Sequence, residues 1–422
     1  MKKIILLLLI GALAGTIGAQ ETPVSLQQCY RLALQNHPLS AQNALLEQTS
    51  QLQQKIWDEN NLPQLNLNGQ ATYQSAVTEL PIKIPGVNSP DIPKDQFKVT
   101  LDASQVIYGG GTISNQKLVE QSSLAISKQG TESDLYKIKE RINLVYFNIL
   151  LTNYTLDVLK INKEELEARL KKIESGINNG TVLPVNAAVI KAELIKVEQK
   201  RIETASQRSS LIALLEVLTG TSIPENSTFT LPDIIVDLDH YSNLRPEYKL
   251  FDLQQQRIDA MKNLTWTKKN PRMYAFGNLG YGRPGLNMFK EEADLFYIVG
   301  AKVSWNFWNW HQTRQELQML DLSKDMLENQ KEAFDINTRA SIQQYLSDIS
   351  KTMELLKTDE AIIALRTEIT DNASSQLENG ILTATEYLTE YNAEIQARLS
   401  ESLHQVQLMQ AKAAYQAATG NL

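Results

Sequence analysis

The residues that could support acid-base or metal chemistry are scattered along this chain. The four histidines, His37, His240, His311 and His404, lie far apart, and none has a neighbouring ligand at the spacing of a metal site. The run Gly109–Gly111 is not followed by the Gly-Lys-Ser/Thr of a phosphate-binding loop, so it predicts a strand-to-helix turn. We therefore expect no enzyme, no metal site and no cofactor, and the sequence alone leaves a spatial clustering of the histidines open.

The most regular polar residues alternate with apolar ones in stretches near 64–74 and 97–107. This alternation places polar side chains on one face of a strand and apolar side chains on the other. It fits a half-buried soluble sheet, and it also fits a membrane barrel with lipid outside and water inside. The run length of about 10 residues is enough for one tilted span and favours the barrel. The side chains then expected to face the lumen are those of Asn66, Asn68, Gln70, Thr72, Lys98, Thr100, Asp102 and Ser104.

Two further strands are predicted near 272–282 and 296–307, where apolar residues alternate in the same way. Aromatic residues gather at the end of the second one, as in the interfacial girdle of a membrane barrel, although such a cluster also suits an ordinary core. They are Trp305, Phe307, Trp308 and Trp310. Four strands cannot close a barrel in lipid, because the smallest have about 8 and an open edge leaves unpaired backbone groups. The barrel interpretation therefore requires an oligomer.

The N-terminal residues 1–19 predict a secretory signal, since Lys2 and Lys3 precede an apolar stretch that ends in small residues. With Cys29 as the one cysteine, no intrachain disulfide can form, and stability must come from packing or assembly. The net charge is −7, and it becomes more negative without Lys2 and Lys3. A nucleic acid is therefore not an expected partner.

The chain is duplicated. His37-Pro38 matches Arg245-Pro246 at an offset of 208, whereas Asn179-Gly180 matches Asn379-Gly380 at an offset of 200. The offset changes between Tyr73 and Phe97, a proline-bearing segment that we interpret as an exposed loop. We therefore divide the chain into a first repeat over 20–220, a linker over 221–232 and a second repeat over 233–422.

Long helices are predicted near 111–177 and 312–378, and shorter ones near 184–218 and 384–418. A heptad seam from Leu135 to Ile177 follows the first long helix, and a second seam from Leu144 to Ile161 lies nearly opposite. A helix with two apolar flanks has a neighbour on each side, as each helix in a helical barrel does. At 1.5 Å per residue this helix would reach about 100 Å, from a strand end to a distal turn at Asn179-Gly180.

These features together resemble the TolC family of outer-membrane efflux proteins (outer membrane factors) over essentially the whole mature chain. The matching pieces are the tandem halves, the helix-to-strand junctions NLPQLNLNGQATY and KNPRMYAFGNLGY, the turn VIYGGGT, and the endings LTG and ATG. The resemblance implies an α+β membrane protein in which four strands per chain contribute to a trimeric 12-stranded outer-membrane β-barrel, continuous with a periplasmic α-helical barrel. It implies a homotrimer in outer-membrane lipid, a periplasmic adaptor protein and an inner-membrane pump of the RND or ABC type.

At the distal turns the resemblance indicates aperture residues. The family pattern of a glycine, a small or hydroxyl residue and an acid is similar to Gly380, Thr383 and Glu386, whereas the first repeat has Gly180, Leu183 and Asn186 and lacks the acid. Three copies of Glu386 could form a carboxylate ring that holds a cation. The alternative interpretation is a solvated acid at a helix start, which the helix dipole favours.

The expected function is a passive exit duct of a tripartite efflux or secretion system. A secreted trimeric coiled-coil structural protein or adhesin without a pore is the alternative. It accounts for the heptads but not for four alternating strands placed symmetrically in two halves.

Overall fold

The computed structural model describes residues 23–78, 92–237 and 243–422. The predicted signal over 1–19 lies outside these residues, as does most of the proline-bearing loop between Tyr73 and Phe97. The chain divides into two compact units, and each takes segments from both sequence repeats. The first unit comprises the chain up to Ala41, Glu132–Pro246 and Asp335–Leu422, and the second comprises Gln42–Thr131 and Glu247–Phe334. Helices combine with one antiparallel sheet, which confirms the predicted fold class in this coarse form.

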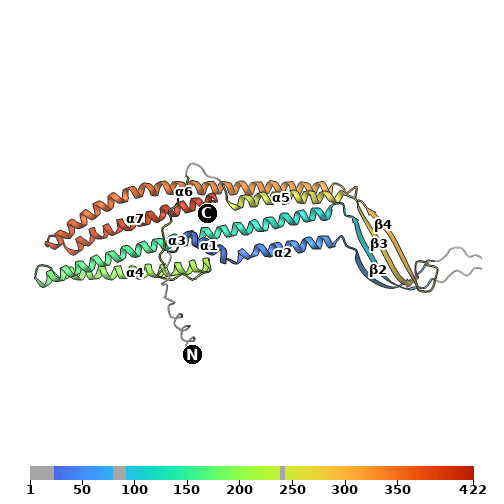
Figure 1. The fold of residues 1–422 in the computed structure, drawn as a ribbon, viewed down its shortest axis with the longest axis horizontal. Coiled ribbons are helices and arrows are strands. Elements are labelled where there is room, and N and C mark those ends of the chain that lie inside the picture. Colours follow the sequence, from blue (N-terminus) through green and yellow to red (C-terminus); the bar gives the residue numbers. More distant parts are fainter. Residues whose placement is uncertain (1–22, 79–91, 238–242) are drawn as a thin grey trace, which may run out of the picture. The chain divides into compact units, whose positions relative to one another are not determined.

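The elements follow the order that periodicity predicts, with a pair of short helices before the first strand (Figure 1). The helices are α1 (Leu26–Asn36), α2 (Pro38–Glu59), α3 (Thr112–Asn178), α4 (Pro184–Thr219), α5 (Pro246–Trp266), α6 (Gln312–Glu378) and α7 (Ala384–Thr419). The strands are β1 (Gln64–Tyr73), β2 (Asp95–Tyr108), β3 (Arg272–Arg283) and β4 (Asp294–Ser304). Both α3 and α6 have 67 residues and contribute to both units.

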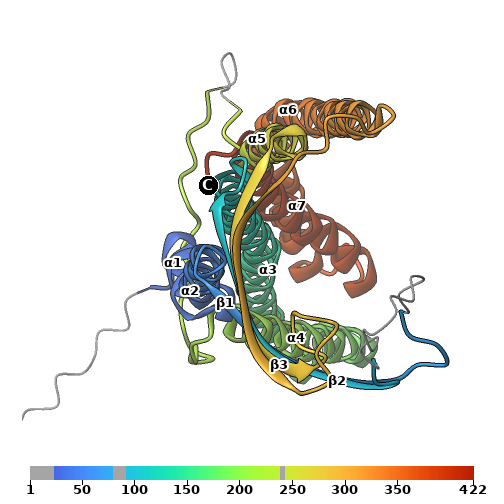
Figure 2. The same cartoon turned by 90° about the vertical axis from the view of Figure 1, so that its right-hand side faces the viewer.

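The second unit contains the sheet, whose strands lie in the order β1-β2-β3-β4 and bend together as one band (Figure 2). All three pairings are antiparallel, and β2 joins the two repeats by pairing with β3. The register shifts between Val106 and Tyr108, so the β2 ladder is irregular near its end. Within the part of the chain that the structure describes, β1 and β4 each pair on one side, and their other edges are open.

Ion pairs connect neighbouring helices in the second unit. Between α5 and α6, Lys324 Nζ lies 3.0 Å from Asp259 and Lys331 Nζ lies 2.9 Å from Asp252. Between α2 and α3, Lys117 Nζ lies 2.5 Å from Asp58. Exposed pairs of this kind each contribute about 0 to 1 kcal/mol, so they set the spacing of the helices more than they stabilise the unit.

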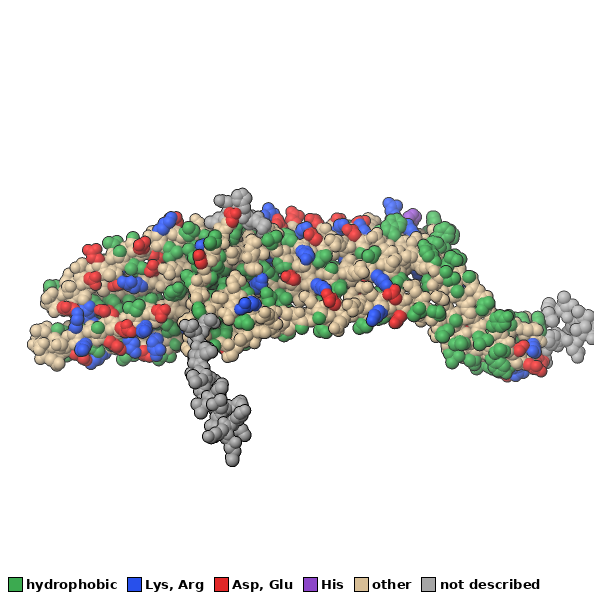
Figure 3. Space-filling view, in the orientation of Figure 1, with side chains coloured by type: hydrophobic (Ala, Val, Ile, Leu, Met, Phe, Trp, Pro, Cys, Tyr) green, Lys and Arg blue, Asp and Glu red, His purple; other side chains and the backbone are tan. Residues whose placement is uncertain are grey.

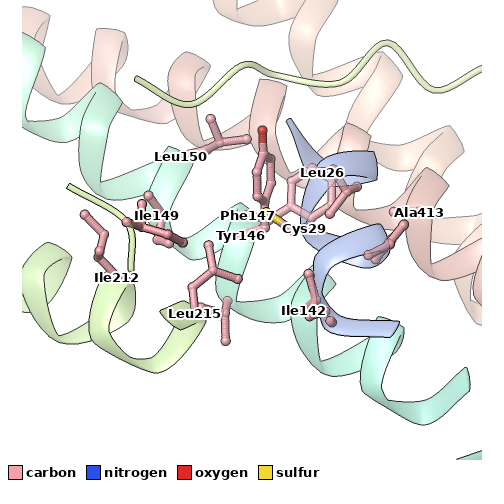
Figure 4. Packing of buried hydrophobic residues seen from close by; sticks show 14 of the residues in the cluster. Leu26, Cys29, Ile142, Tyr146, Phe147, Ile149, Leu150, Ile212, Leu215 and Ala413 are labelled. Atoms are coloured by element: carbon pink, nitrogen blue, oxygen red, sulfur yellow. The ribbon is translucent and has the colours of Figure 1, made fainter. Parts of the chain in front are cut away.

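The first unit is held by an apolar core in which α1 packs against α3 and α4 (Figure 4). At its centre the Tyr146 hydroxyl lies 2.7 Å from the Thr230 carbonyl and 2.9 Å from the Val24 carbonyl, and burial raises the pKa of this tyrosine to about 12. The segment 221–232, predicted as a linker, contributes Ile223 and Phe229 to the same core. The predicted linker is therefore part of the first unit and of its core.

The two predicted seams of α3 differ in burial. Residues of the first seam are buried at Ile142, Ile149 and Leu166. The second seam has Phe147 buried but leaves Leu144 and Ile161 57% and 62% exposed. An apolar flank of α3 is thus uncovered within the described chain.

The α1–α3–α4 core should dominate the stability of the first unit. Leu215 on α4 is fully buried, so Leu215→Ala removes packed methyl groups and leaves a cavity. We expect it to lower the free energy of unfolding by about 2 to 5 kcal/mol. The measurement is denaturant unfolding of the detergent-solubilised protein, followed by far-UV circular dichroism. The control is Gln207→Ala, an exposed change on the same helix; equal unfolding midpoints for the two variants would contradict the assignment of the core.

Candidate functional site

The eight strand residues predicted to face a lumen lie together on one face of the sheet. The register pairs Asn66 with Asp102, Asn68 with Thr100 and Gln70 with Lys98 across β1 and β2. Ser104 and Thr72 continue the same face, because residues two apart in a strand point the same way. The face is polar and presents both donors and acceptors to water. That it lines a lumen remains a prediction.

Asp102 is the centre of hydrogen bonding on this face. Its Oδ2 accepts from Asn68 Nδ2 at 2.5 Å and from the Thr100 hydroxyl at 3.2 Å. Its Oδ1 accepts from Asn278 Nδ2 on β3. The carboxylate therefore links three strands and both repeats on one surface.

The opposite face of the sheet is apolar along all four strands. On the view in Figure 3, hydrophobic side chains gather over the strands, whereas acidic and basic side chains are dispersed over the helices. Many of these apolar side chains are exposed, and Leu67 and Tyr297 are each about three-quarters accessible. Others on this face are Leu65, Val99, Leu101, Leu279, Tyr281, Val299 and Val303. An apolar surface this continuous marks contact with a membrane or a protein.

The polar face changes character where it passes from β2 to β3 and β4. In place of Asn, Gln and Thr, these strands carry Tyr274, Phe276, Phe296 and Ile298 on that face, interspersed with glycines. Sequence reasoning missed this change, because it considered the apolar alternation of the second repeat and not the residues between. Reading the alternate positions of β3 and β4 would have revealed it.

The turn after β4 holds the predicted aromatic cluster, and its backbone is unusual. Trp310 and His311 have φ values of 50° and 68°, and they correspond at the offset of 200 to Gly110 and Gly111, whose φ values are 66° and 82°. The left-handed conformation costs a non-glycine residue about 1 to 2 kcal/mol. Trp310 is 79% exposed, so packing inside the described chain does not explain why a tryptophan occupies this left-handed position. An indole that faces outward at the end of the apolar surface suits an interface between lipid and water.

At the predicted aperture, Glu386 closes a capping box with Thr383. The Glu386 N–H donates to the Thr383 hydroxyl oxygen at 3.3 Å, and Glu386 Oε2 accepts from the Thr383 N–H and hydroxyl, each at 2.9 Å. The two bonds to the carboxylate hold the pKa of Glu386 below its usual range, and the bond from the Thr383 backbone N–H has the larger effect. The carboxylate is thus occupied as a helix cap, as one of the two interpretations of this residue requires.

The two distal turns lie next to each other. Asn186 Oδ1, near the start of α4, accepts from the backbone N–H of Ala384, the first residue of α7, at 3.3 Å. Gly180 and Gly380 both adopt positive φ, 71° and 72°, as the repeat predicts for equivalent turns. The two turns differ in capping, since Leu183 provides no side-chain cap to α4. The asymmetry seen in the sequence is therefore also an asymmetry of hydrogen bonding.

A buried arginine joins the repeats near these turns. Arg169 on α3 is 6% exposed, and its guanidinium contacts Glu378 at 2.8 Å, Glu165 at 3.3 Å and the Ser374 hydroxyl at 2.5 Å. It also lies over the ring of Tyr387 on α7, 4.8 Å from the centroid. Sequence reasoning missed Arg169, although its spacing from Leu166 places it on the buried face of the heptad.

His240 lies outside the described residues, and the other three histidines do not form a metal-binding cluster with one another. His404 Nδ1 on α7 lies 2.6 Å from Asp359 Oδ2 on α6, and the pair is largely buried. Across the described ranges, no group of three or more His, Cys, Asp or Glu side chains is placed to hold a metal ion. None of the helices in those ranges has both the length and the apolar character needed to cross a membrane.

Similarity to solved structures places the fold. No protein-family model matches the sequence, and no curated protein matches it. Solved structures do match. The Campylobacter jejuni CmeC outer membrane channel is 16% identical, with 94% of this chain and 85% of that chain covered at a TM-score of 0.69. The outer membrane protein VceC from Vibrio cholerae is 14% identical, with 94% and 96% covered at a TM-score of 0.69.

CusC, described as forming a transmembrane channel, is 12% identical, with 93% of this chain and 91% of that chain covered at a TM-score of 0.72. At these identities the similarity establishes the fold. The chain has the fold of the outer membrane factor channels, and the resemblance predicted from the sequence is confirmed at that level.

The capping box at Thr383 should be measurable. Thr383→Ala removes the side-chain acceptor for the Glu386 N–H, and we expect it to destabilise the first turn of α7 by about 1 kcal/mol. The measurement is amide hydrogen exchange over residues 384–388. The matched control, Thr385→Ala, changes an exposed threonine on the same turn; equal protection in the two variants would show that the cap does not hold the turn.

The effect of Glu386 on the same turn should depend on pH. Because its folded-state pKa is lowered, its contribution is present above the usual value of 4.5 and is lost as the pH falls through the folded-state pKa. Amide exchange over residues 384–388 should therefore be faster in Glu386→Ala than in the unmodified protein at neutral pH. In acid the exchange rates of the two proteins should become equal. A difference that persists unchanged into acid would argue against the carboxylate as the cap.

Proposed function

We propose that this chain is one subunit of an outer-membrane exit duct, with the polar face of its sheet lining a water-filled lumen and the apolar face toward lipid. The observation that carries the proposal is the one-sided sheet, which exposes an apolar face and, within the described residues, has an open edge at β1 and at β4. In a soluble monomer such a face would be exposed to water. In a closed barrel it meets lipid, and every backbone group finds a partner.

Closure requires further copies of the chain. Each chain supplies four strands, and β4 of one copy can pair with β1 of the next. Eight strands make a barrel that side chains about fill, so a conducting lumen needs more strands. A homotrimer with twelve strands meets this need and is the assembly that the resemblance implies.

Exposed apolar side chains on the helices support assembly side by side. On α2, Leu45, Leu52 and Ile56 follow helical spacing and are at least half exposed. On α6, Met319, Leu322 and Met326 form a similar row. On α3, the second seam leaves Leu144 and Ile161 uncovered. We assign these rows to contacts between copies in a helical barrel in the periplasm.

The named channels of the same fold support a location for the proposed duct, and its partners are those that the resemblance to the family implies. CmeC is described as an outer membrane channel and VceC as an outer membrane protein, which supports an outer-membrane location for this chain. A duct that crosses the outer membrane has no energy source there, so we propose passive conduction coupled to a periplasmic adaptor and an inner-membrane pump of the RND or ABC type. Under this proposal the pump, not the duct, selects the cargo.

The alternative function is a secreted coiled-coil scaffold without a pore. The rows on the helices suit it, but the exposed apolar face of the sheet does not. Cell fractionation and planar-bilayer recording separate the two. A scaffold would be recovered from the medium or from the cell surface and would conduct no current, whereas a duct would be recovered with outer membranes and would conduct.

Adjacent residues of β1 offer a sharp test, because Asn66 and Leu67 point to opposite faces. Leu67→Arg places a charge on the proposed lipid face, at a cost of about 2 to 4 kcal/mol per site near the bilayer midplane. We expect loss of the assembled oligomer from the membrane fraction. Asn66→Arg stands opposite Asp102 on the proposed lumen face, and we expect normal assembly with ion selectivity shifted toward anions.

Assembly is read from the oligomer band on semi-native gels of membrane fractions. Selectivity is read from the reversal potential under a salt gradient. Equal tolerance of arginine at Asn66 and Leu67 would contradict the assignment of the two faces. A reversal potential that Asn66→Arg leaves unchanged would contradict the assignment of the polar face to the lumen.

A further inference from the structure

We propose that Gly280 and Gly300 set the width of the lumen, by letting the rings of Phe296 and Phe276 lie flat against the wall of the barrel. The inference rests on the proposed function, since it needs this face of the sheet to point into the lumen. It assigns a positioning role to two glycines and two phenylalanines of the second repeat. The first repeat has no equivalent arrangement in its register.

The register makes the arrangement reciprocal. Across β3 and β4, Gly280 pairs with Phe296, and Phe276 pairs with Gly300. Asn278 and Ile298 form the pair between them on the same face. Each strand therefore offers one ring and one glycine, and each ring has the glycine of the other strand directly opposite.

The rings occupy the space that a side chain at the glycines would need. A β-carbon on Gly280 would lie 2.3 Å from Phe296 Cζ and under 3 Å from both Cε atoms. A β-carbon on Gly300 would lie 2.8 Å from Phe276 Cζ. Phe296 is 9% exposed even though its strand has no sheet packed against it, so its burial comes from lying along the sheet. Strand glycines often mark such close approach.

Lys98 covers the Phe296 ring from the neighbouring strand. Its Nζ lies 5.0 Å from the ring centroid, within the range of a cation–π contact. Lys98 itself pairs with Gly282 on β3, a third glycine on this face of the sheet. Because the backbone lies beneath the Phe296 ring, the ring can yield to an added β-carbon by rotating away from the sheet, which would also displace Lys98 from above it.

A methyl group at either glycine should therefore turn a ring into the lumen. Both φ angles lie outside the left-handed region, so alanine introduces no backbone strain, and the effect comes from the contact with the ring. In a closed oligomer the change repeats in every copy, and the rings would converge at one level. Replacing Phe296 with alanine has the opposite effect, because it removes the obstructing atoms.

The width is best measured at that level rather than as total conductance, which a narrower aperture elsewhere in the duct could limit. In Lys302→Cys the cysteine lies on the same face, two residues past Gly300 and farther from the β3–β4 hairpin. In Thr72→Cys the cysteine lies near the β1–β2 hairpin, and its labelling shows whether a reagent has entered the lumen at all. Intact cells are labelled from outside with maleimide–polyethylene glycol reagents of graded size. Cys29 is 1% exposed, and the protein without an added cysteine gives the background.

In Gly280→Ala and in Gly300→Ala, we expect labelling of Lys302→Cys by the larger reagents to fall relative to Thr72→Cys, while the smallest reagent still reacts. In Gly280→Ala combined with Phe296→Ala, labelling should recover. Two matched glycines lie on the apolar face. At Gly277 the nearest atom to an added β-carbon is 3.6 Å away, and at Gly69 there is none within 4 Å. Gly277→Ala and Gly69→Ala should leave the size limit unchanged.

The outcomes separate the inference from the function on which it rests. If the smallest reagent labels neither Thr72→Cys nor Lys302→Cys in intact cells, the face does not line a lumen and the proposed function fails. If it reaches both, but the size limit in Gly280→Ala equals that in Gly277→Ala, the inference is overturned and the duct stands. Should Gly280→Ala fail to assemble, Phe296→Ala alone must raise the size limit, and an unchanged limit would overturn the inference.

Discussion

Backbone groups at the edge of a sheet need hydrogen-bond partners wherever water is absent, and under the proposed function this requirement governs the sheet of the second unit. β1 and β4 each present an open edge in the described chain, and the face between these edges is apolar and exposed. Either feature alone could occur in a soluble protein, where water satisfies the edge or another layer covers the face. In the proposed duct, copies join edge to edge and lipid covers the face, so the oligomer would be a condition for the sheet to exist in a membrane.

The two sequence repeats build equivalent elements but contribute different surfaces. The first repeat supplies polar side chains such as Asn68 and Asp102 to one face of the sheet, whereas the second supplies phenylalanines paired with glycines. The glycine turn after β2 becomes a strained Trp310–His311 turn after β4. At the distal turns a capping acid is present in the second repeat alone. The two halves thus share their elements and differ in the side chains that they present.

Features with a local period could be predicted from the sequence, because their physical cause lies within a few residues. Alternation from Leu65 to Tyr73 reflects the two faces of a strand, and the structure has β1 at Gln64–Tyr73. The heptad seam through Ile142 and Ile149 reflects a helix that buries one side, and both side chains are buried. Glycine spacing likewise indicated the equivalent turns at Gly180 and Gly380.

Features that depend on pairing between distant segments could not be predicted in this way. The contact of Asn186 with Ala384, and the placement of each phenylalanine over a glycine of the other strand, require a register that local periodicity does not contain. Arg169 is an intermediate case. Its heptad position predicts burial, but the charge argues for exposure, and the partners that decide between them lie more than 200 residues away at Ser374 and Glu378.

Arg169 also shows why burial of a charge near the distal turns is informative. Desolvation of a guanidinium is costly, and an ion pair such as the one with Glu378 often does little more than offset that cost. Apolar residues of similar volume would stabilise this interface between α3, α6 and α7 at least as well. Arg169 instead contacts all three helices: a carboxylate on α3, a carboxylate on α6 and a ring on α7. These contacts constrain how the three helices are arranged. The network therefore ties the two repeats together at this end of the first unit, next to the apolar cluster that contains Leu166 and Tyr387.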